Sequence, residues 1–154
     1  ACLLGRMKYV GDDYCLVAEE AELWAHSLYS TGKLRWGNLE RLGAGLPTPR
    51  DPAGEKALYF LRERFSGQIC TGLSLRAVVI PQVTGNRDTR LRPATPAEAF
   101  LAAAPSTVGQ LPGESAASYQ RIARIMRRLP CHVLEAGEDL PQIPQALCRL
   151  IEGG

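Results

Sequence analysis

The chain alternates short apolar segments with polar turns, a pattern that predicts a mixed α/β fold. Lys8–Val10 is a short β-prone stretch that ends at Gly11-Asp12-Asp13. Tyr14–Ala18 and Glu22–Leu28 are two apolar stretches with a short acidic link between them, which predicts a hairpin. Leu75–Pro81, within the apolar segment Leu75–Val83, is the clearest strand, and its continuous apolar run predicts a strand buried on both faces of a sheet.

The clearest helix start lies at Thr95, where the residue types of a capping box coincide. Thr95 is the expected N-cap, Pro96 suits the first helical position, and Glu98 stands at the third. We expect this helix to end near Ala104, because Pro105 cannot donate a backbone hydrogen bond.

The remaining elements are weaker but consistent with the same fold class. Further helices are expected over Trp36–Leu42, with Gly37 or Asn38 as its cap, over Ser115–Leu129 and over Pro144–Glu152, and a short strand over Cys131–Leu134. Ala1–Met7 resembles the last turns of a helix, and Gly43–Gly54, rich in glycine and proline, predicts a loop that could act as a lid. The predicted fold is α/β, with a mixed sheet and covering helices.

Composition excludes several classes of protein. The chain has 154 residues, of which 45% are hydrophobic and 22% charged, as in an ordinary globular domain. No apolar run approaches the ~20 residues needed to cross a bilayer, so no membrane contact is expected. The net charge of +2 is far from that of a dedicated nucleic-acid binder. Arginine strongly outnumbers lysine, which is typical of GC-rich bacterial genes.

Cysteine and histidine usage argues against a metal centre of nitrogen and sulfur ligands. The five cysteines are widely spaced and form no C-x-x-C pair, so neither a zinc site nor a redox motif is predicted. We expect them to be buried thiols in a reducing cytoplasm. His26 and His132 are the two histidines, and His26 is interpreted as structural. Arg121, Arg124 and Arg128 are interpreted as a solvated helix face.

The most informative local feature is the acid pair Asp12–Asp13, which follows the first predicted strand. Ligands of open α/β sheets bind at the carboxyl ends of strands. Two neighbouring carboxylates can divide the work there, one holding Mg²⁺ and the other orienting or deprotonating a hydroxyl group. Gly-Asp-Asp is also a common turn sequence, so a purely structural turn is the alternative.

The order of these segments resembles the HPr kinase/phosphorylase family and related bacterial serine kinases, whose fold core is shared with ATP-dependent phosphoenolpyruvate carboxykinase. Ala1–Val17, with its Gly-Asp-Asp, is similar to the family block that runs from mid-helix through an apolar strand to the acid pair. Tyr29–Trp36 is similar to a family segment with a tyrosine followed by Lys-Leu and an aromatic residue. The Leu75–Pro81 strand and the final strand and helix also fit, so the resemblance covers nearly the whole chain.

The resemblance implies a role for each matching residue. Asp12 would be the catalytic acid/base that activates a serine hydroxyl, and Asp13 would help to hold Mg²⁺ with the phosphates of ATP. Lys33 is a weaker candidate for a phosphate contact, with a solvated lysine at a strand end as the alternative. The implied activity is ATP-dependent phosphorylation of a serine in a protein or peptide substrate, in the cytoplasm, by a protein that could be a homo-oligomer.

One family feature has no counterpart in the sequence. Phosphoryl transfer of this type needs a G-x-x-x-x-G-K-[ST] loop, and Gly32-Lys33 is followed by Leu34 where serine or threonine is required. In the family this loop precedes the block that opens this chain. We therefore expect a single kinase-like domain over 1–154, truncated at its N-terminus so that the strand of the phosphate loop and the start of the following helix are missing. The alternative is a non-catalytic binding or scaffold module that retains the fold.

Overall fold

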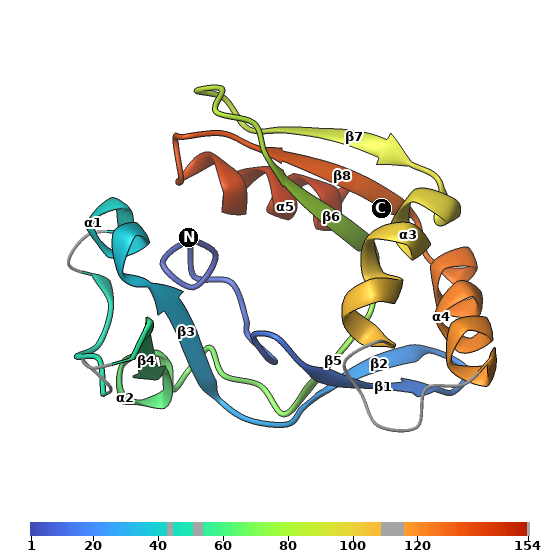
Figure 1. Ribbon diagram of the computed structural model, residues 1–154, viewed down its shortest axis with the longest axis horizontal. Helices are drawn as coiled ribbons and strands as arrows, with labels where there is room; N and C mark the ends of the chain where they lie inside the picture. The colour runs from blue at the N-terminus through green and yellow to red at the C-terminus, as the bar shows by residue number, and fades with distance from the viewer. Residues whose placement is uncertain (43–44, 51–53, 109–115, 154) are drawn as a thin grey trace. The chain divides into compact units, whose positions relative to one another are not determined.

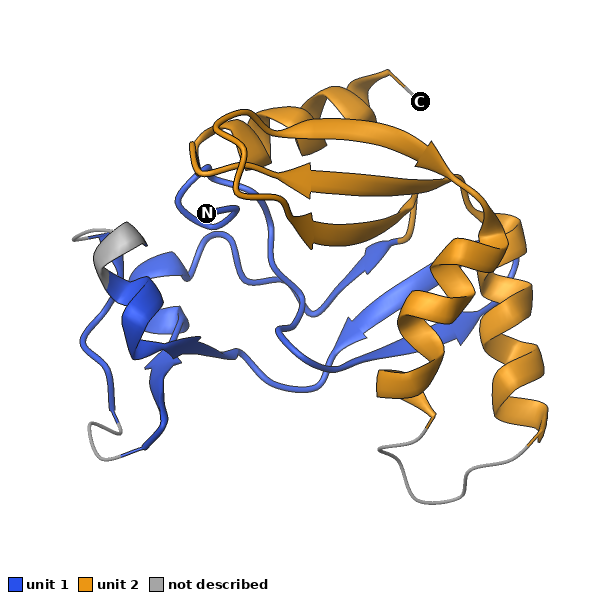
Figure 2. Cartoon of the chain, turned by 45° about the horizontal axis from the view of Figure 1, so that its top comes forward, with its two compact units in different colours: residues 1–74 blue, residues 75–154 orange. Residues whose placement is uncertain are grey.

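The computed structural model describes residues 1–42, 45–50, 54–108 and 116–153. The chain divides into two compact units, Ala1–Ser74 and Leu75–Gly154 (Figures 1 and 2). Each unit combines strands and helices, so the mixed α/β class expected from the sequence is confirmed.

The first unit holds two small antiparallel sheets. Its elements are β1 (Cys15–Glu19), β2 (Leu23–Ser27), β3 (Thr31–Arg35), the 3₁₀ turn η1 (Trp36–Asn38), α1 (Leu39–Leu42), β4 (Lys56–Phe60), α2 (Arg62–Phe65) and β5 (Gly72–Ser74). One sheet has the order β1-β2-β5 and the other pairs β3 with β4. The predicted hairpin is confirmed, with Cys15 opposite Ser27 and Glu19 opposite Leu23.

The core of the first unit lies around β4 and α2. Ala57, Tyr59, Leu61 and Phe65 are buried together there. The predicted short helix is present as η1 followed by α1, and η1 begins after Arg35, so Gly37 and Asn38 lie inside this 3₁₀ turn and do not cap it. Of the predicted loop over 43–54, residues 43–44 and 51–53 lie outside the described residues.

In the described part of the second unit, a three-stranded sheet is accompanied by three helices. Its elements are β6 (Val78–Val83), β7 (Arg90–Ala94), α3 (Pro96–Thr107), α4 (Ala116–Arg128), β8 (Cys131–Ala136) and α5 (Gln142–Glu152). The strand order is β6-β8-β7, with β6 parallel and β7 antiparallel to β8. The core cluster joins α3, α4 and β8 through buried Ala99, Val108, Ile122, Met126 and Cys131.

The strand predicted to be buried on both faces is instead the edge strand β6. Val78, Val79 and Ile80 are half-buried, whereas Pro81 and the two residues after it are exposed. The buried central strand is β8, whose Val133 is 1% exposed. Proline lacks the N–H that a central strand needs, which explains why the strand with Pro81 lies at the edge.

The capping box at Thr95 is confirmed, but the predicted end of that helix is wrong. Thr95 and Glu98 form both bonds of the box, and α3 continues through Pro105 to Thr107. The Val108 N–H still donates to the Ala104 carbonyl at 2.9 Å, and Val108 is only 2% exposed. Burial of Val108 therefore offsets the hydrogen bond that Pro105 cannot make.

The first residues form a single turn rather than helical turns. The Gly5 N–H donates to the Ala1 carbonyl, the Arg6 N–H to Leu3 and the Met7 N–H to Cys2. Arg6 has a positive φ of 64°, so the turn closes with the geometry of a helix C-terminus. The strand predicted over 8–10 is reduced to one parallel bridge between Tyr9 and Ile69.

Candidate functional site

Asp12 and Asp13 lie in an exposed turn between the Tyr9 bridge and β1. Tyr9 is held on both sides of its backbone. Its N–H donates to the Gln68 carbonyl at 2.9 Å, and its carbonyl accepts from the Cys70 N–H at 2.8 Å. The turn that carries the acid pair therefore begins from a backbone that is fixed to a segment far along the chain.

Gly11 allows the chain to turn tightly before the acids. A Cβ atom at this position would lie 2.6 Å from the Tyr14 carbonyl oxygen, a distance that side chains do not adopt. The glycine of Gly-Asp-Asp is therefore required by the close approach of the backbone to itself, and that approach sets where Asp12 and Asp13 project.

Two hydrogen bonds join this turn to β3. The Asp12 Oδ2 atom accepts from the backbone N–H of Lys33 at 2.8 Å. The Tyr9 hydroxyl donates to the Thr31 carbonyl, also at 2.8 Å. The two segments on which the family resemblance rests are thus brought together. Within the described residues, Asp12 Oδ1 and both oxygens of Asp13 accept no hydrogen bond, so three carboxylate oxygens remain for other partners.

Lys33 reaches Asp12 through its backbone, not through its ammonium group. The residue lies in the middle of β3, opposite Leu58, and is exposed. Its Nζ atom makes no hydrogen bond or ion pair with any described residue. The structure therefore places the Lys33 main chain at the acid pair and leaves its side chain in solvent.

Tyr29 is a side chain at the acid pair to which the sequence analysis gave no role. Desolvation raises the pKa of Tyr29, and the carboxylates of Asp13 and Asp12 raise it further, because a phenolate beside them is unfavourable. A hydrogen bond with the backbone of Tyr14 acts in the opposite direction. Tyr29 is thus a neutral hydroxyl beside the acids at physiological pH. Its position in Tyr29–Trp36, the segment that resembles the kinase family, was the signal for it in the sequence.

Tyr9 shares this environment. Burial raises the pKa of Tyr9 strongly, with further contributions from Asp12, Tyr29 and Asp13. Because its hydroxyl donates to the Thr31 carbonyl, ionisation would also remove a hydrogen bond. Tyr9 is therefore a structural donor that holds the acid turn against β3.

The donor set fits a magnesium ion that is shared with phosphates, not a metal ion held by protein alone. Within the described residues no group of three or more His, Cys, Asp or Glu side chains could hold a metal ion. Asp12 and Asp13 supply hard carboxylate oxygens, and Mg²⁺ is commonly held by one or two carboxylates together with substrate phosphates.

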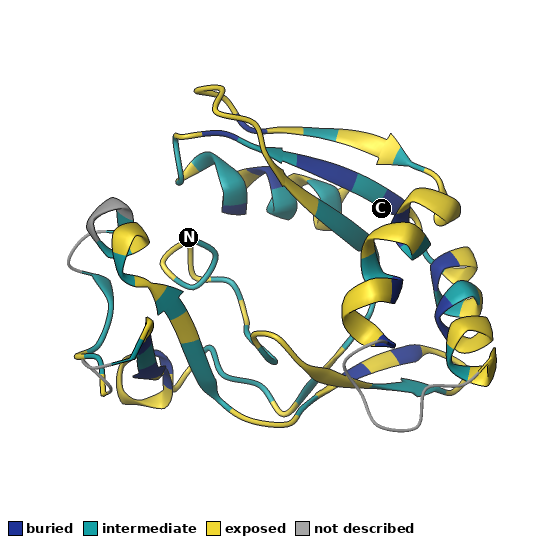
Figure 3. Ribbon diagram, in the orientation of Figure 1, coloured by how far each residue is buried: buried dark blue, intermediate teal, exposed yellow. Residues whose placement is uncertain are grey.

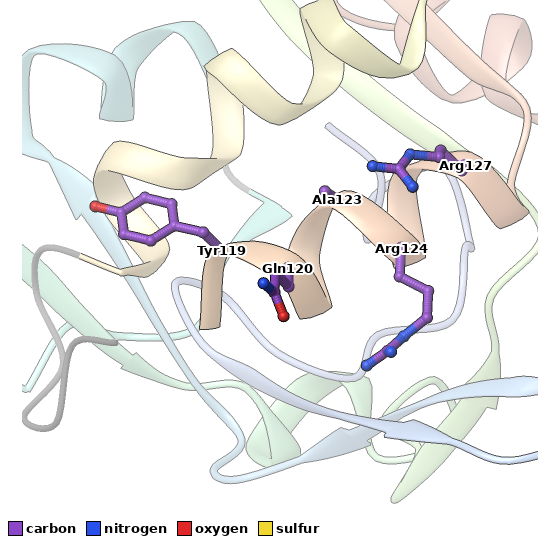
Figure 4. A pocket seen from close by; sticks show the side chains of 5 residues that line it. All are labelled: Tyr119, Gln120, Ala123, Arg124 and Arg127. Atoms are coloured by element: carbon purple, nitrogen blue, oxygen red, sulfur yellow. The ribbon is translucent and has the colours of Figure 1, made fainter. Parts of the chain in front are cut away.

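A second candidate region is an open hollow on α4, of about 410 Å³ (Figure 4). Its lining consists of Tyr119, Gln120, Ala123, Arg124 and Arg127. These side chains offer hydrogen-bond donors to an anion, but no carboxylate or thiol is among them. The hollow therefore lacks the carboxylate pair of the acid turn and is a weaker candidate for the predicted chemistry.

The described part of the chain contains no helix that is both long enough and apolar enough to span a membrane. Comparison with known proteins found no matching family model, no matching curated protein and no matching solved structure.

Proposed function

We propose that the chain supplies the acid pair of an ATP-dependent serine kinase resembling HPr kinase/phosphorylase, with a protein or peptide as acceptor. The hydrogen bond between Asp12 Oδ2 and the Lys33 N–H is the observation that supports this most directly. It joins the Gly-Asp-Asp turn to Tyr29–Trp36, two segments that resemble the kinase family.

Asp12 is suited to the acid/base role because its two oxygens differ. Oδ2 is fixed by the Lys33 N–H, which orients the carboxylate, while Oδ1 accepts no hydrogen bond from the described residues. Oδ1 is therefore the atom that we assign to take the proton of the acceptor hydroxyl. Because the hydrogen bond to Oδ2 fixes the conformation of the Asp12 side chain, Oδ1 is already oriented toward a substrate hydroxyl when the substrate binds.

Asp13 is assigned to the metal, because its carboxylate makes no hydrogen bond with the described residues and lies one residue further along the exposed turn. Mg²⁺ and ATP would bring the γ-phosphoryl group and neutralise charge on its oxygens. Desolvation and the carboxylates of Asp13 and Asp12 keep the Tyr29 hydroxyl neutral, and we assign it to donate a hydrogen bond to an anionic oxygen of the substrate. The resembled family carries its phosphate loop ahead of the block that is similar to Ala1–Val17, so catalysis would need such a loop in the same protein.

A non-catalytic binding or scaffold module is the second candidate. The observation that favours it is the absence of any G-x-x-x-x-G-K-[ST] string from the 154 residues. Upstream coding sequence separates the two functions. A phosphate loop shortly before Ala1 would support the kinase, and a start codon without such a loop would support the scaffold.

The decisive experiment measures transfer of the labelled γ-phosphate of ATP to serine peptides by the full-length gene product. Asp12→Asn should abolish transfer without unfolding the protein, because asparagine keeps an oxygen for the Lys33 N–H but is not a base at neutral pH. Asp13→Asn should raise the Mg²⁺ concentration required for half-maximal rate.

Glu55→Gln is the matched control, because it also replaces an exposed acid with its amide but lies outside the acid turn. This variant should transfer phosphate at the wild-type rate. Undiminished transfer by Asp12→Asn would remove the catalytic assignment, and equal loss in Glu55→Gln would show a general effect of charge.

A further inference from the structure

The face of the β3–β4 sheet that points away from the core carries three positive charges. Buried residues alternate with more exposed ones along β4 (Figure 3), and the buried ones belong to the core of the first unit. Lys56 of β4 and Lys33 and Arg35 of β3 are exposed. Lys33 lies opposite Leu58, and Arg35 lies opposite Lys56. Lys33, Arg35 and Lys56 are called the cationic face below.

Arg35 and Lys56 are held close together although their charges repel. The Lys33 N–H donates outside the sheet, so Lys33 occupies a non-hydrogen-bonded position of the antiparallel pair, and so does Arg35 two residues later. Residues opposite each other at such positions have Cα atoms only about 4.5 Å apart. The indole N–H of Trp36 donates to the Gly54 carbonyl at 2.8 Å and fixes this end of the two strands. Like charges directly opposite on a sheet are destabilising, so folding gives no reason for this pair.

No acidic side chain neutralises the cationic face. Strands β3 and β4 contain neither aspartate nor glutamate. Within the described residues, the side chains of the cationic face form no ion pair and no hydrogen bond, either with Glu55 beside them in the chain or with any other residue. Glu63 pairs with Arg50 instead. The face therefore offers unneutralised positive charge to an anion from outside the chain.

The acid turn and the like-charged pair lie at different ends of β3. The acid turn is joined to the first half of the strand, through the Thr31 carbonyl and the Lys33 N–H. Arg35 and Lys56 lie at the other end, roughly 7 Å beyond Lys33 along the strand. Negative charge on a bound segment is therefore attracted to one end of β3 and repelled from the other, so charge alone decides which part of the segment lies where.

We propose that the cationic face docks the acidic part of an extended acceptor segment whose serine lies at the acid turn. This deepens the proposed function and rests on it. A strand laid over the sheet turns every second side chain toward it, at the spacing of Lys33 and Arg35. Acidic residues at alternate positions on one side of the serine would all meet the cations, and the residues between them would face solvent.

A peptide fits this face better than the phosphates of a nucleotide. Leu58 and Phe60 lie on the same face, opposite Lys33 and Thr31, and Phe60 is 44% exposed. A polypeptide can cover these apolar groups and also present carboxylates to cations two residues apart, whereas a phosphate chain offers charge alone. The proposed function also already places the phosphates with the metal at Asp13.

Calorimetric titration and steady-state phosphate transfer with synthetic peptides test the docking. Each probe holds one serine and three glutamates that alternate with alanine, and two probes place the glutamates before or after the serine. The comparison peptides replace each glutamate with lysine. At least one glutamate peptide should bind, more weakly as salt rises, and neither lysine peptide should.

Arg35→Gln with Lys56→Gln removes the like-charged pair and leaves Lys33, whose main chain holds the acid turn, in place. The Kd and the KM of the glutamate peptide should rise about fivefold, because two exposed ion pairs are lost, while kcat and the KM of ATP stay unchanged. Urea unfolding should show the double variant at least as stable as wild type, since the repulsion is removed. Arg62→Gln with Arg64→Gln is the matched control, because it removes two exposed charges from α2 of the same unit and should leave peptide binding unchanged.

Three results would overturn the proposal. The first is equal binding of glutamate and lysine peptides, or unchanged affinity for the glutamate peptide in the Arg35→Gln/Lys56→Gln variant. The second is a rise in the KM of ATP with an unchanged peptide KM, which would assign the cations to the nucleotide. The third is a double variant that unfolds at lower urea than wild type, which would assign the two cations to folding.

Failure of the docking proposal and failure of the kinase proposal give different results. If the glutamate peptide binds through the cationic face but accepts no phosphate, the docking surface stands and the kinase assignment fails. If glutamate and lysine peptides accept phosphate with equal KM, the kinase stands and the docking surface fails. A raised peptide KM with an unchanged kcat in the double variant supports both proposals together.

Discussion

The carboxylate of Asp12 accepts a hydrogen bond from the backbone N–H of Lys33, with 2.8 Å between Oδ2 and the nitrogen. This contact spans 21 residues and fixes the acid turn to β3. A structural role and a catalytic role for Asp12 therefore do not exclude each other, because each can use a different oxygen of the same carboxylate. Substitutions that keep or remove the accepting oxygen can separate the two roles.

Asp12→Ala and Asp12→Asn should differ in stability. Alanine removes the acceptor, so we expect a loss of about 1 kcal/mol in the free energy of unfolding, the usual net value of a hydrogen bond. Asparagine keeps a carbonyl oxygen and should lose less. Urea unfolding measures the stability, and hydrogen exchange of the Lys33 amide reports the bond itself. Equal protection of that amide in wild type and Asp12→Ala would contradict the assignment.

Gly11→Ala should displace the acid turn. Its new Cβ would lie 2.6 Å from the Tyr14 carbonyl oxygen, which is backbone and cannot rotate away. We expect lower stability and a change in the amide chemical shifts of residues 11–14 and of Lys33. Gly67→Ala is the control, because no heavy atom lies within 4 Å of a Cβ built there. Similar losses from the two substitutions would show that the close approach at Gly11 is not the cause.

The sequence predicted elements whose signals are local, and it failed where the outcome depended on distant packing. The Thr95–Glu98 capping box and the β1–β2 hairpin were correctly predicted, because each is determined by residues a few positions apart. The edge position of β6 depends on which strands pair, and no local pattern carries that information. The continuation of α3 beyond Pro105 depends on the burial of Val108 among residues of α4 and β8.

The candidate site shows the same division. The acid pair could be selected from the sequence, because Gly-Asp-Asp after an apolar stretch is a local pattern. The contact of Asp12 with Lys33 could not be predicted from the sequence, because it joins a turn to a strand that follows the β1–β2 hairpin. Tyr29 lies in the segment that resembles the family, but the effect of Asp13 and Asp12 on its pKa depends on how the chain folds and could not be predicted from the sequence.

Asp13→Asn should lower the pKa of Tyr29. Desolvation raises that pKa first, and the Asp13 carboxylate is the largest charged contribution, so removing the charge favours the phenolate. The measurement is an alkaline titration followed by NMR of the tyrosine rings, with Tyr29→Phe to assign the signal. Glu55→Gln should leave the titration of Tyr29 unchanged. A Tyr29 pKa that is equal in wild type and Asp13→Asn would place the tyrosine away from the acids.

Thr95→Ala should destabilise the protein by about 1 kcal/mol at neutral pH, the usual value of an N-cap side chain. Urea unfolding of this variant and of wild type measures the difference.

The contribution of Glu98 to the same capping box should depend on pH. Hydrogen bonds from the backbone and side chain of Thr95, together with Arg92, lower the pKa of Glu98. The ionised Glu98 carboxylate therefore stabilises the folded protein at pH values above the ordinary pKa of glutamate. This stabilisation is lost as the pH falls through the lowered pKa that Glu98 has in the folded protein. Urea unfolding should show that wild type and Glu98→Gln differ at neutral pH and converge in acid. A difference that persists in acid would exclude the carboxylate as its source.

Tyr59→Phe should leave the protein as stable as wild type or make it more stable. Tyr59 is 2% exposed, and its hydroxyl has no hydrogen-bond partner within the described residues. A buried hydroxyl without a partner carries a desolvation cost that phenylalanine removes, so a gain of up to about 1 kcal/mol is expected.

Tyr9→Phe is the matched comparison for Tyr59→Phe, because it deletes the same atom from a hydroxyl that donates to the Thr31 carbonyl at 2.8 Å. We expect this variant to lose about 1 kcal/mol, the net value of one hydrogen bond. Urea unfolding of both variants at neutral pH gives the comparison. The two changes in the free energy of unfolding should have opposite signs because only the Tyr9 hydroxyl has a hydrogen-bond partner, whereas both rings pack in the same unit. If Tyr59→Phe were as destabilised as Tyr9→Phe, the Tyr59 hydroxyl would have to bind a partner in solution, such as a buried water molecule.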